Sequence, residues 1–211
     1  MYQPNAHIEG RVEVMHELIR RHPLGLIVTM NADGLNGNHI PLEIDPEPAP
    51  YGTLRGHVAR ANSLWRETEG AVMPMVVFQG PSRYVTPSWY PSKQATGKVV
   101  PTYNYMVVHA YGRLRAIDDP AWLRSFLDRL TARHEQHRPM PWKIDDAPAD
   151  YLEAMLKAIV GIEIRIERLI GKWKISQNRM QQDHAGVIAG LESVDADDAR
   201  EMLEAMRPPG A

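Results

Sequence analysis

Apolar residues in this chain form short runs or strict alternations over most of its length, and both patterns predict β-strands. Runs rich in β-branched and aromatic residues, bounded by glycine and proline, are typical of buried strands. Strict alternation over residues 161–169 predicts a strand with only one buried face. The predicted strands are Leu24–Met30, Asn38–Asp45, Thr53–Val58, Ala71–Gln79, Met106–Ile117 and Gly161–Leu169.

Helical spacing of apolar residues predicts helices near the start, after the middle and at the end of the chain. N-cap residues mark where several of these helices begin, because a side-chain oxygen there accepts hydrogen bonds from the first free backbone N–H groups. We find no internal repeat and no shift in composition that marks a linker. We therefore expect a single domain over residues 1–211, mainly β with helical appendages (α+β). The predicted helices are Arg11–His22, a helix from Pro120 capped by Asp118 or Asp119, Ala149–Val160, a helix capped by Ser176 that ends near Gly190, and Asp195–Met206.

Two prolines modify this pattern. Pro41 cannot donate a ladder hydrogen bond, so its strand is expected at an edge or with a bulge. The pair Gly80-Pro81 predicts a break after the apolar run Val76–Phe78. The following stretch, Ser82–Lys98, is long, aromatic and rich in hydroxyl groups, so we expect a rigid loop that forms a binding surface.

Composition excludes some kinds of chemistry. The chain has no cysteine, which rules out disulfides, thiolate nucleophiles and cysteine metal sites. His134 and His137 are three residues apart, which differs from the hydrolase zinc signature, so no metal site is predicted. The N-terminus lacks a signal-peptide pattern and no apolar run reaches about 18 residues, so we expect a cytoplasmic protein without membrane contact.

The overall charge bears on DNA binding. Lys and Arg total 24 against 26 Asp and Glu, a net charge of −2, whereas a dedicated DNA-binding domain usually carries a basic surplus. The only compact basic cluster is Lys172, Lys174 and Arg179, which suits a cofactor or subunit contact at least as well as DNA. Direct DNA binding therefore stays open.

A phosphate site is predicted where the strand Thr53–Val58 ends. Asn62 or Ser63 is a good N-cap for a short helix, and the free N–H groups at a helix N-terminus favour an anion. Arg60 adds a fixed charge with a bidentate fork. A plainer reading is that Arg60 and Asn62 only cap the helix, while nearby aromatic residues fill the core.

Several segments resemble, in order, the hallmarks of one family, the FMN-binding negative transcriptional regulators of PaiB type. The resemblance covers nearly the whole chain, and motifs at consistent spacing are more specific than any single motif. Ser63 stands where the family usually has proline, and Tyr103 where tryptophan is common. The matching segments are Met1–Pro4, His57–Trp65, Gly80–Tyr90, Val100–Tyr105 and Lys174–Arg179.

This resemblance implies a split β-barrel of the FMN-binding type. Composition alone favours the plainer reading of Arg60 and Asn62, whereas the resemblance favours a phosphate site. FMN requires cations and donors for its phosphate, polar groups for the edge of its ring and apolar cover elsewhere. The phosphate is expected at the segment after residue 59 and at Lys172, the ring edge at residues 38–40 and Asn104, and the cover from aromatic side chains. The predicted cofactor-binding residues are Asn38, His39, Ile40, Arg60, Ala61, Asn62, Ser63, Trp89, Tyr103, Asn104 and Lys172.

The resemblance also implies a homodimer, with the loop Ser82–Lys98 reaching the partner subunit. It leaves two functions to compare. One is a flavin-dependent negative transcriptional regulator, whose operator the sequence does not name. The other is an FMN-dependent oxidoreductase or flavin reductase-like protein acting on a small molecule, so whether the chain is an enzyme stays open. A protein that only stores flavin is a third possibility.

Overall fold

The computed structural model describes residues 1–66 and 72–207, and the chain divides into two compact units. Unit 1 consists of Met1–Leu18, Gln79–Val108 and the chain from Ile170 onward. Unit 2 consists of Ile19–Phe78 and His109–Leu169. The unit boundaries fall inside three long strands, so each unit contains part of each of them.

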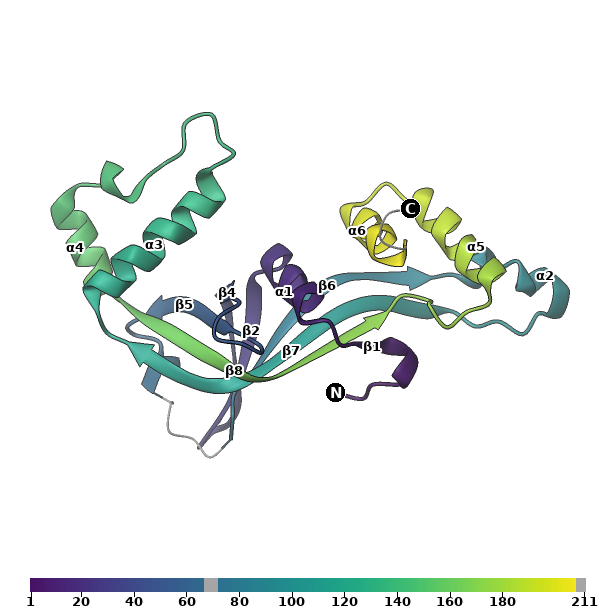
Figure 1. Cartoon of the computed structure of the whole chain (residues 1–211), viewed down its shortest axis with the longest axis horizontal. Helices are drawn as coiled ribbons and strands as arrows, with labels where there is room; N and C mark the ends of the chain where they lie inside the picture. Colours follow the sequence, from purple (N-terminus) through teal and green to yellow (C-terminus); the bar gives the residue numbers. More distant parts are fainter. Residues whose placement is uncertain (67–71, 208–211) are drawn as a thin grey trace. The chain divides into compact units, whose positions relative to one another are not determined.

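The strands form a sheet whose hydrogen-bonded order is β3-β2-β6-β7-β8-β5-β4, with β1 pairing to β8 (Figure 1). Every pairing with a recorded register is antiparallel. The predicted Ala71 lies outside the described residues. The strands are β1 Ile8–Glu9, β2 Leu24–Asn31, β3 Gly34–Pro41, β4 Glu43–Asp45, β5 Thr53–Ala59, β6 Met75–Val85, β7 Thr102–Ile117 and β8 Ile159–Lys174.

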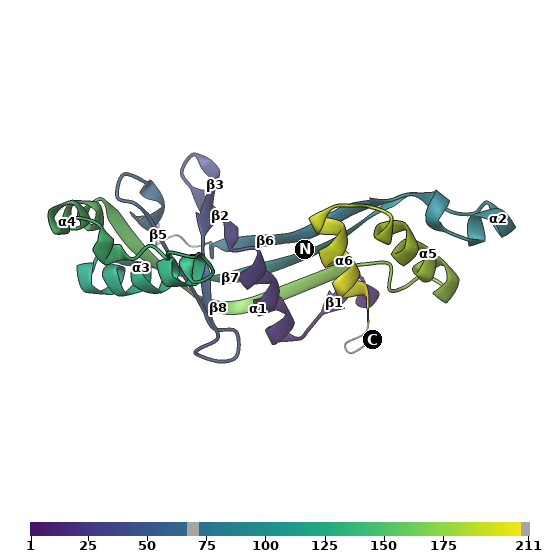
Figure 2. The same ribbon diagram turned by 90° about the horizontal axis from the view of Figure 1, so that it is seen from above.

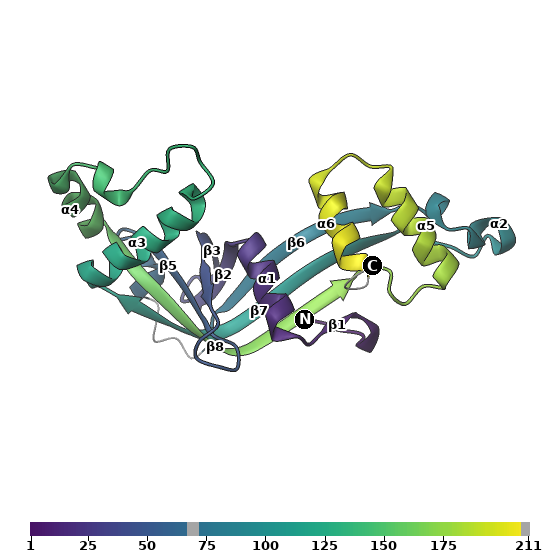
Figure 3. The same ribbon diagram turned by 45° about the horizontal axis from the view of Figure 1, so that its top comes forward.

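The β2–β3 hairpin confirms the predicted strand Leu24–Met30, and its second strand begins at Gly34 rather than at the predicted Asn38 (Figure 3). Its register runs from Leu24 opposite Pro41 to Asn31 opposite Gly34, whose φ of 110° requires a residue that tolerates positive φ. β3 ends the strand order, so Pro41 lies on an edge strand as expected. The predicted continuous strand is interrupted at Leu42, whose N–H donates instead to the Pro23 carbonyl oxygen at 2.8 Å.

The predicted break at Gly80-Pro81 is wrong, because β6 continues through both residues to Val85. Gly80 serves close packing, since a Cβ there would lie 2.9 Å from Leu18 Cδ1. The predicted loop therefore begins later than Ser82. It contains the 3₁₀ helix η3 (Pro87–Trp89) and the short helix α2 (Ser92–Thr96).

The longer helices largely follow the predictions. Asp119 caps α3, its Oδ1 accepting the Ala121 N–H at 2.8 Å. The helix predicted to reach Val160 ends at Lys157, because Ile159 and Val160 pair with β5. Ser176 does not cap the next helix, which begins at Gln181. The longer helices are α1 Val12–Arg21, α3 Pro120–Glu135, α4 Ala149–Lys157, α5 Gln181–Glu192 and α6 Asp197–Met206.

In each unit a helix makes a close contact at a point where a glycine permits it. In unit 2, a Cβ on Gly161 of β8 would lie 2.4 Å from the Trp122 ring of α3, and that ring stacks on Phe126 at 5.3 Å. In unit 1, a Cβ on Gly190 of α5 would lie 2.2 Å from the Trp89 ring. Figure 2 shows α5 beside α6 in the same unit.

Candidate functional site

Unit 1 contains a small cavity whose recorded lining consists of neutral polar or basic side chains. Its volume is about 70 Å³, room for a small polar group, since a water molecule takes about 30 Å³ of liquid. Among the described residues that line it, none is acidic. The lining residues are His7, Thr102, Asn104, Lys174, Ser176, Asn178 and Arg179.

The local fold explains how distant residues reach this cavity. β1 pairs with β8 so that Ile8 lies opposite Lys172, which brings His7 to the end of β8. Lys174 Nζ donates to Thr102 Oγ1 and to the Tyr103 carbonyl oxygen, and thereby ties β8 to the start of β7. Three segments far apart in sequence therefore supply one lining.

The electrostatics of the cavity favour an anion. Burial lowers the pKa of Lys174 below its ordinary value, and the neighbouring charges of Arg179 and Lys172 lower it further. Burial likewise lowers the pKa of His7, with Lys174 as the next cause. A negatively charged ligand would offset the repulsion between these cations and stabilise their charged forms.

His7 adds a second indication of a ligand. Its side chain is 8% exposed, and its Nδ1 is a buried atom without a hydrogen-bond partner. Buried polar atoms normally have partners, so the unpaired His7 atom in the lining of a donor-rich cavity is consistent with a bound group. Beside the cavity, the guanidinium carbon of Arg179 lies 5.0 Å from the ring centroid of the buried Tyr90.

The predicted phosphate segment after β5 lies in unit 2, where Arg60 already has protein partners. Its Nη1 and Nη2 donate to Asp118 Oδ2 and Oδ1 at 2.8 and 2.6 Å. Its Nε and Nη2 also donate to the carbonyl oxygens of Lys157 and Ile159 at 2.7 and 3.0 Å. A phosphate at Arg60 would therefore compete with the Asp118 carboxylate for the guanidinium group.

Asn38 and Asn62, both predicted site residues, lie together in unit 2. Asn62 Nδ2 donates to Asn38 Oδ1 at 2.9 Å, and Asn62 Oδ1 accepts the Leu64 N–H at 2.9 Å. The second bond caps the 3₁₀ helix Ser63–Arg66, as the sequence predicts. Asn38 Nδ2 is buried and unpartnered, so it is free to donate to a ligand oxygen.

The remaining predicted residues divide between the units. In unit 2, His39 is exposed on the edge strand β3, Ile40 pairs with Gly25, and Ala61 and Ser63 are exposed after β5. In unit 1, Trp89 packs on α5 and Tyr103 is 58% exposed. Lys172 donates to the Tyr2 carbonyl oxygen at 3.0 Å, and its charge contributes to the lowered pKa of the lining residue Lys174.

Asn104 is the predicted residue that lines the unit 1 cavity, while the other lining residues were absent from the predicted set. The basic cluster with Lys174 and Arg179 was a usable signal in the sequence. His7 carried no such signal, because only the pairing of β1 with β8 brings it near Lys174.

Solved structures with the same fold define the class of protein. The FAD and heme binding protein of Mycobacterium smegmatis matches with a TM-score of 0.58 at 15% identity, over 80% of this chain and 73% of that protein. A conserved hypothetical protein of Mycobacterium tuberculosis matches with a TM-score of 0.55 at 12% identity, over 85% and 94%. The fold is the predicted α+β split β-barrel.

Sequence relatives define the family. The family model described as "Putative FMN-binding domain" matches residues 1–168. An uncharacterized protein of Emericella nidulans is 35% identical over 100% of this chain and 98% of its own length. The protease synthase and sporulation protein PAI 2 of Bacillus subtilis is 32% identical over 98% and 96%. The chain belongs to this FMN-binding family of PaiB type, and FMN is the cofactor of that family.

The residues present fit FMN at two places, each judged within its own unit. The unit 1 cavity offers cations and an unpartnered His7 atom to a phosphate. In unit 2, Asn38 offers an unpartnered amide donor to a ring oxygen.

In the part of the chain that the structure describes, no helix is both long enough and apolar enough to span a membrane.

Proposed function

We propose that this protein is a cytoplasmic FMN-binding homodimer that uses the flavin for redox chemistry on a small molecule. The observation that carries the proposal is the donor-lined cavity of unit 1, which we assign to the FMN phosphate. Lys174 and Arg179 supply charge, Thr102 and the second amide hydrogen of Asn104 supply hydrogen bonds, and Ser176 holds the Asn104 amide in place.

When bound, FMN supplies electron or hydride transfer, and the chain's own residues bind and orient it. Within unit 2, Asn38, His39 and the Ile40 backbone on β3 remain proposed contacts for the edge of a flavin ring, separately from the phosphate assignment in unit 1. The other residues predicted from sequence, including Arg60 in unit 2 and Trp89 in unit 1, remain proposed flavin contacts, each within its own unit. Their roles depend on whether FMN displaces their present protein contacts.

A comparison of FMN with riboflavin tests the phosphate assignment, because riboflavin lacks the phosphate. Lys174→Met should weaken FMN binding to the apoprotein at least about tenfold, or about 1.4 kcal/mol, and leave riboflavin binding unchanged. Lys157→Met is the matched control, since it removes a cation from an exposed pair with Glu153. Flavin fluorescence quenching measures all of these affinities. An equal loss for both flavins would refute the assignment.

The homodimer is a separate part of the proposal. Tyr84 and Tyr103 form an exposed edge-to-face pair in unit 1, with ring centroids 5.9 Å apart and side chains 48% and 58% exposed. Aromatic side chains are enriched at interfaces relative to the rest of the protein surface, which supports a subunit contact. Sedimentation velocity should give a dimer at concentrations on the order of micromolar. A monomer at those concentrations would contradict this part.

A negative transcriptional regulator is the second candidate. The similarity to PAI 2 of Bacillus subtilis, named for protease synthesis and sporulation, supports it. The helices α3 and α4 support it less, because residues 136–148 separate them, whereas a helix-turn-helix has a turn of about 3–4 residues. DNA binding that weakens steeply as salt rises would favour the regulator. Substrate-dependent reoxidation of reduced FMN would favour the redox enzyme.

A further inference from the structure

Unit 2 contains a larger cavity that the proposed flavin site does not use. Its volume is about 260 Å³, and it lies between the strand β4, one residue of β5 and the helix α3. Three guanidinium groups and two carboxylates line it, which leaves a surplus of positive charge. The lining residues are Glu43, Ile44, Asp45, Pro46, Arg55, Arg129 and Arg133.

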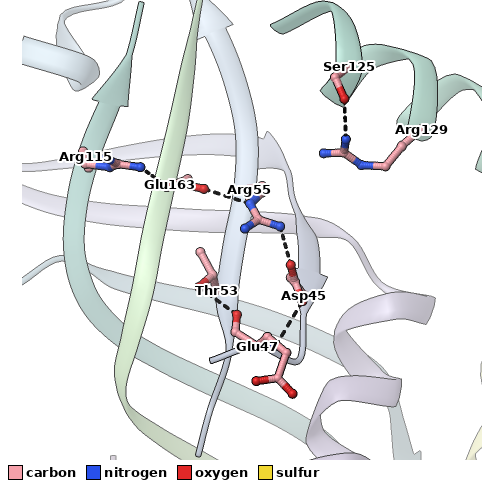
Figure 4. A network of polar contacts seen from close by, with 8 residues as sticks. All are labelled: Asp45, Glu47, Thr53, Arg55, Arg115, Ser125, Arg129 and Glu163. Atoms are coloured by element: carbon pink, nitrogen blue, oxygen red, sulfur yellow. Dashed lines mark hydrogen bonds and ion pairs between the residues drawn. The ribbon is translucent and has the colours of Figure 1, made fainter. Parts of the chain in front are cut away.

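One arginine of this cavity is fixed by carboxylates (Figure 4). Arg55 Nη1 pairs with Asp45 Oδ2, and Arg55 Nε donates to Glu163 Oε1 at 2.8 Å. Arg115 Nη2 donates to the other oxygen of Glu163 at 2.5 Å. Two arginines and two carboxylates therefore balance each other on this side, and the surplus charge belongs to the α3 side.

The two arginines of α3 have weaker partners. Arg129 Nη1 donates to the neutral Ser125 hydroxyl on its own helix at 2.8 Å, as Figure 4 shows. Arg133 Nη2 donates to the Arg20 carbonyl oxygen at 3.0 Å, and its Nη1 lies 3.9 Å from Glu43 Oε1. Residues four apart lie on the same face of a helix, so both side chains face the cavity with unused donors.

The acidic residues restrict the ligand. Glu43 and Asp45 line the same cavity, and they would repel a dianion such as phosphate more than a monoanion. They also offer acceptors to a hydroxyl or ammonium group. A guanidinium fork matches the two oxygens of a carboxylate.

We propose that this cavity binds a small organic carboxylate that carries a hydroxyl or amino group, in the size range of a hydroxy acid or an amino acid. Arg129 and Arg133 hold the carboxylate, while Glu43 accepts from the second polar group. Arg55 is held by its ion pairs with Asp45 and Glu163, and it forms part of the cavity wall. This proposal does not depend on FMN binding, so it can be tested whether or not the flavin site is correct.

Titration calorimetry on the full-length protein at constant ionic strength tests this proposal, with L-lactate and L-glutamate as probes. At least one of them should bind with a Kd of about 1 mM or tighter. The neutral amide of lactate should not bind, and inorganic phosphate should bind at least about tenfold more weakly than the better carboxylate. Absence of binding by both carboxylates, or equal binding of phosphate, would overturn the proposal.

Variants assign the binding to the arginines. Arg129→Gln should weaken carboxylate binding at least about tenfold. The affinity of Arg129→Lys should lie between those of wild type and Arg129→Gln, because lysine keeps the charge without the guanidinium fork. Arg124→Gln is the matched control, since Arg124 lies on the same helix, pairs with Asp145 and does not line this cavity. If Arg124→Gln weakens binding as much as Arg129→Gln, the effect is general charge and the assignment is wrong. Circular dichroism checks that every variant is folded.

Discussion

The Asn104 amide and the Ser176 hydroxyl exchange two hydrogen bonds, 3.0 and 3.1 Å long, within unit 1. Asn104 is 1% exposed and Ser176 is 4% exposed, and both line the donor-rich cavity. Ser176 also has a φ of 65°, a backbone conformation that favours glycine. The pair therefore fixes one wall of the cavity while the backbone of Ser176 is strained.

Replacing Ser176 separates the hydrogen bonds from the backbone strain. Ser176→Ala should lower the free energy of unfolding by about 1–3 kcal/mol, because it leaves the buried Asn104 amide unpaired. Ser176→Gly loses the same bonds but relieves the positive φ, so its loss should be smaller by about 1 kcal/mol. Urea unfolding measures both. If glycine costs as much as alanine, the backbone of Ser176 contributes no strain.

Asn62 offers a test of capping against cofactor binding. Asn62→Ala removes the cap on Leu64 and should cost about 1 kcal/mol of unfolding free energy. Asn62→Asp keeps an oxygen for the cap and loses the bond to Asn38 Oδ1, which a turn of the Asn38 amide can replace, so it should lose less stability than Asn62→Ala. Its negative charge should weaken FMN binding if the phosphate lies near residue 62. Urea unfolding and FMN titration together separate these roles. Unchanged FMN affinity in both variants would limit Asn62 to capping.

Arg60 can be tested through its ion-pair partner. Because the guanidinium is bonded to Asp118 and to two carbonyl oxygens, we expect Arg60→Ala to lower FMN affinity less than Lys174→Ala does. Asp118→Asn weakens the competing pair and leaves the guanidinium freer. Tighter FMN binding by Asp118→Asn would show that the phosphate reaches Arg60. A larger effect of Arg60→Ala than of Lys174→Ala would move the phosphate site to unit 2.

The lowered pKa of His57 predicts that the stability of the folded protein depends on pH. Burial lowers the pKa of His57 below 6.5, and its ring meets the Phe126 ring edge-on at 6.0 Å. The unfolded chain therefore binds a proton more readily than the folded chain as pH falls through 6.5. Stability should drop below that pH until the folded pKa is passed. Urea midpoints at several pH values should show a smaller drop for His57→Gln, and an equal drop would exclude His57 as a cause.

The sequence by itself determined the elements whose signals are local. The apolar runs of β2 and β5 and the Asp119 cap were placed correctly, because neighbouring residues along the chain suffice to specify a strand or a helix start. The family motifs likewise identified FMN, which composition does not reveal. Of the lining of the unit 1 cavity, however, the predicted site included only Asn104.

The tertiary structure decided what depends on distant partners. The strand β6 continues through Gly80-Pro81, and Gly80 there permits close packing of Leu18, a residue distant in sequence. Ser176, just after β8, bonds Asn104 on the neighbouring strand β7 instead of capping a helix. His7 reaches Lys174 only through the pairing of β1 with β8. Strand register places these residues together, and register depends on the whole sheet rather than on any one segment.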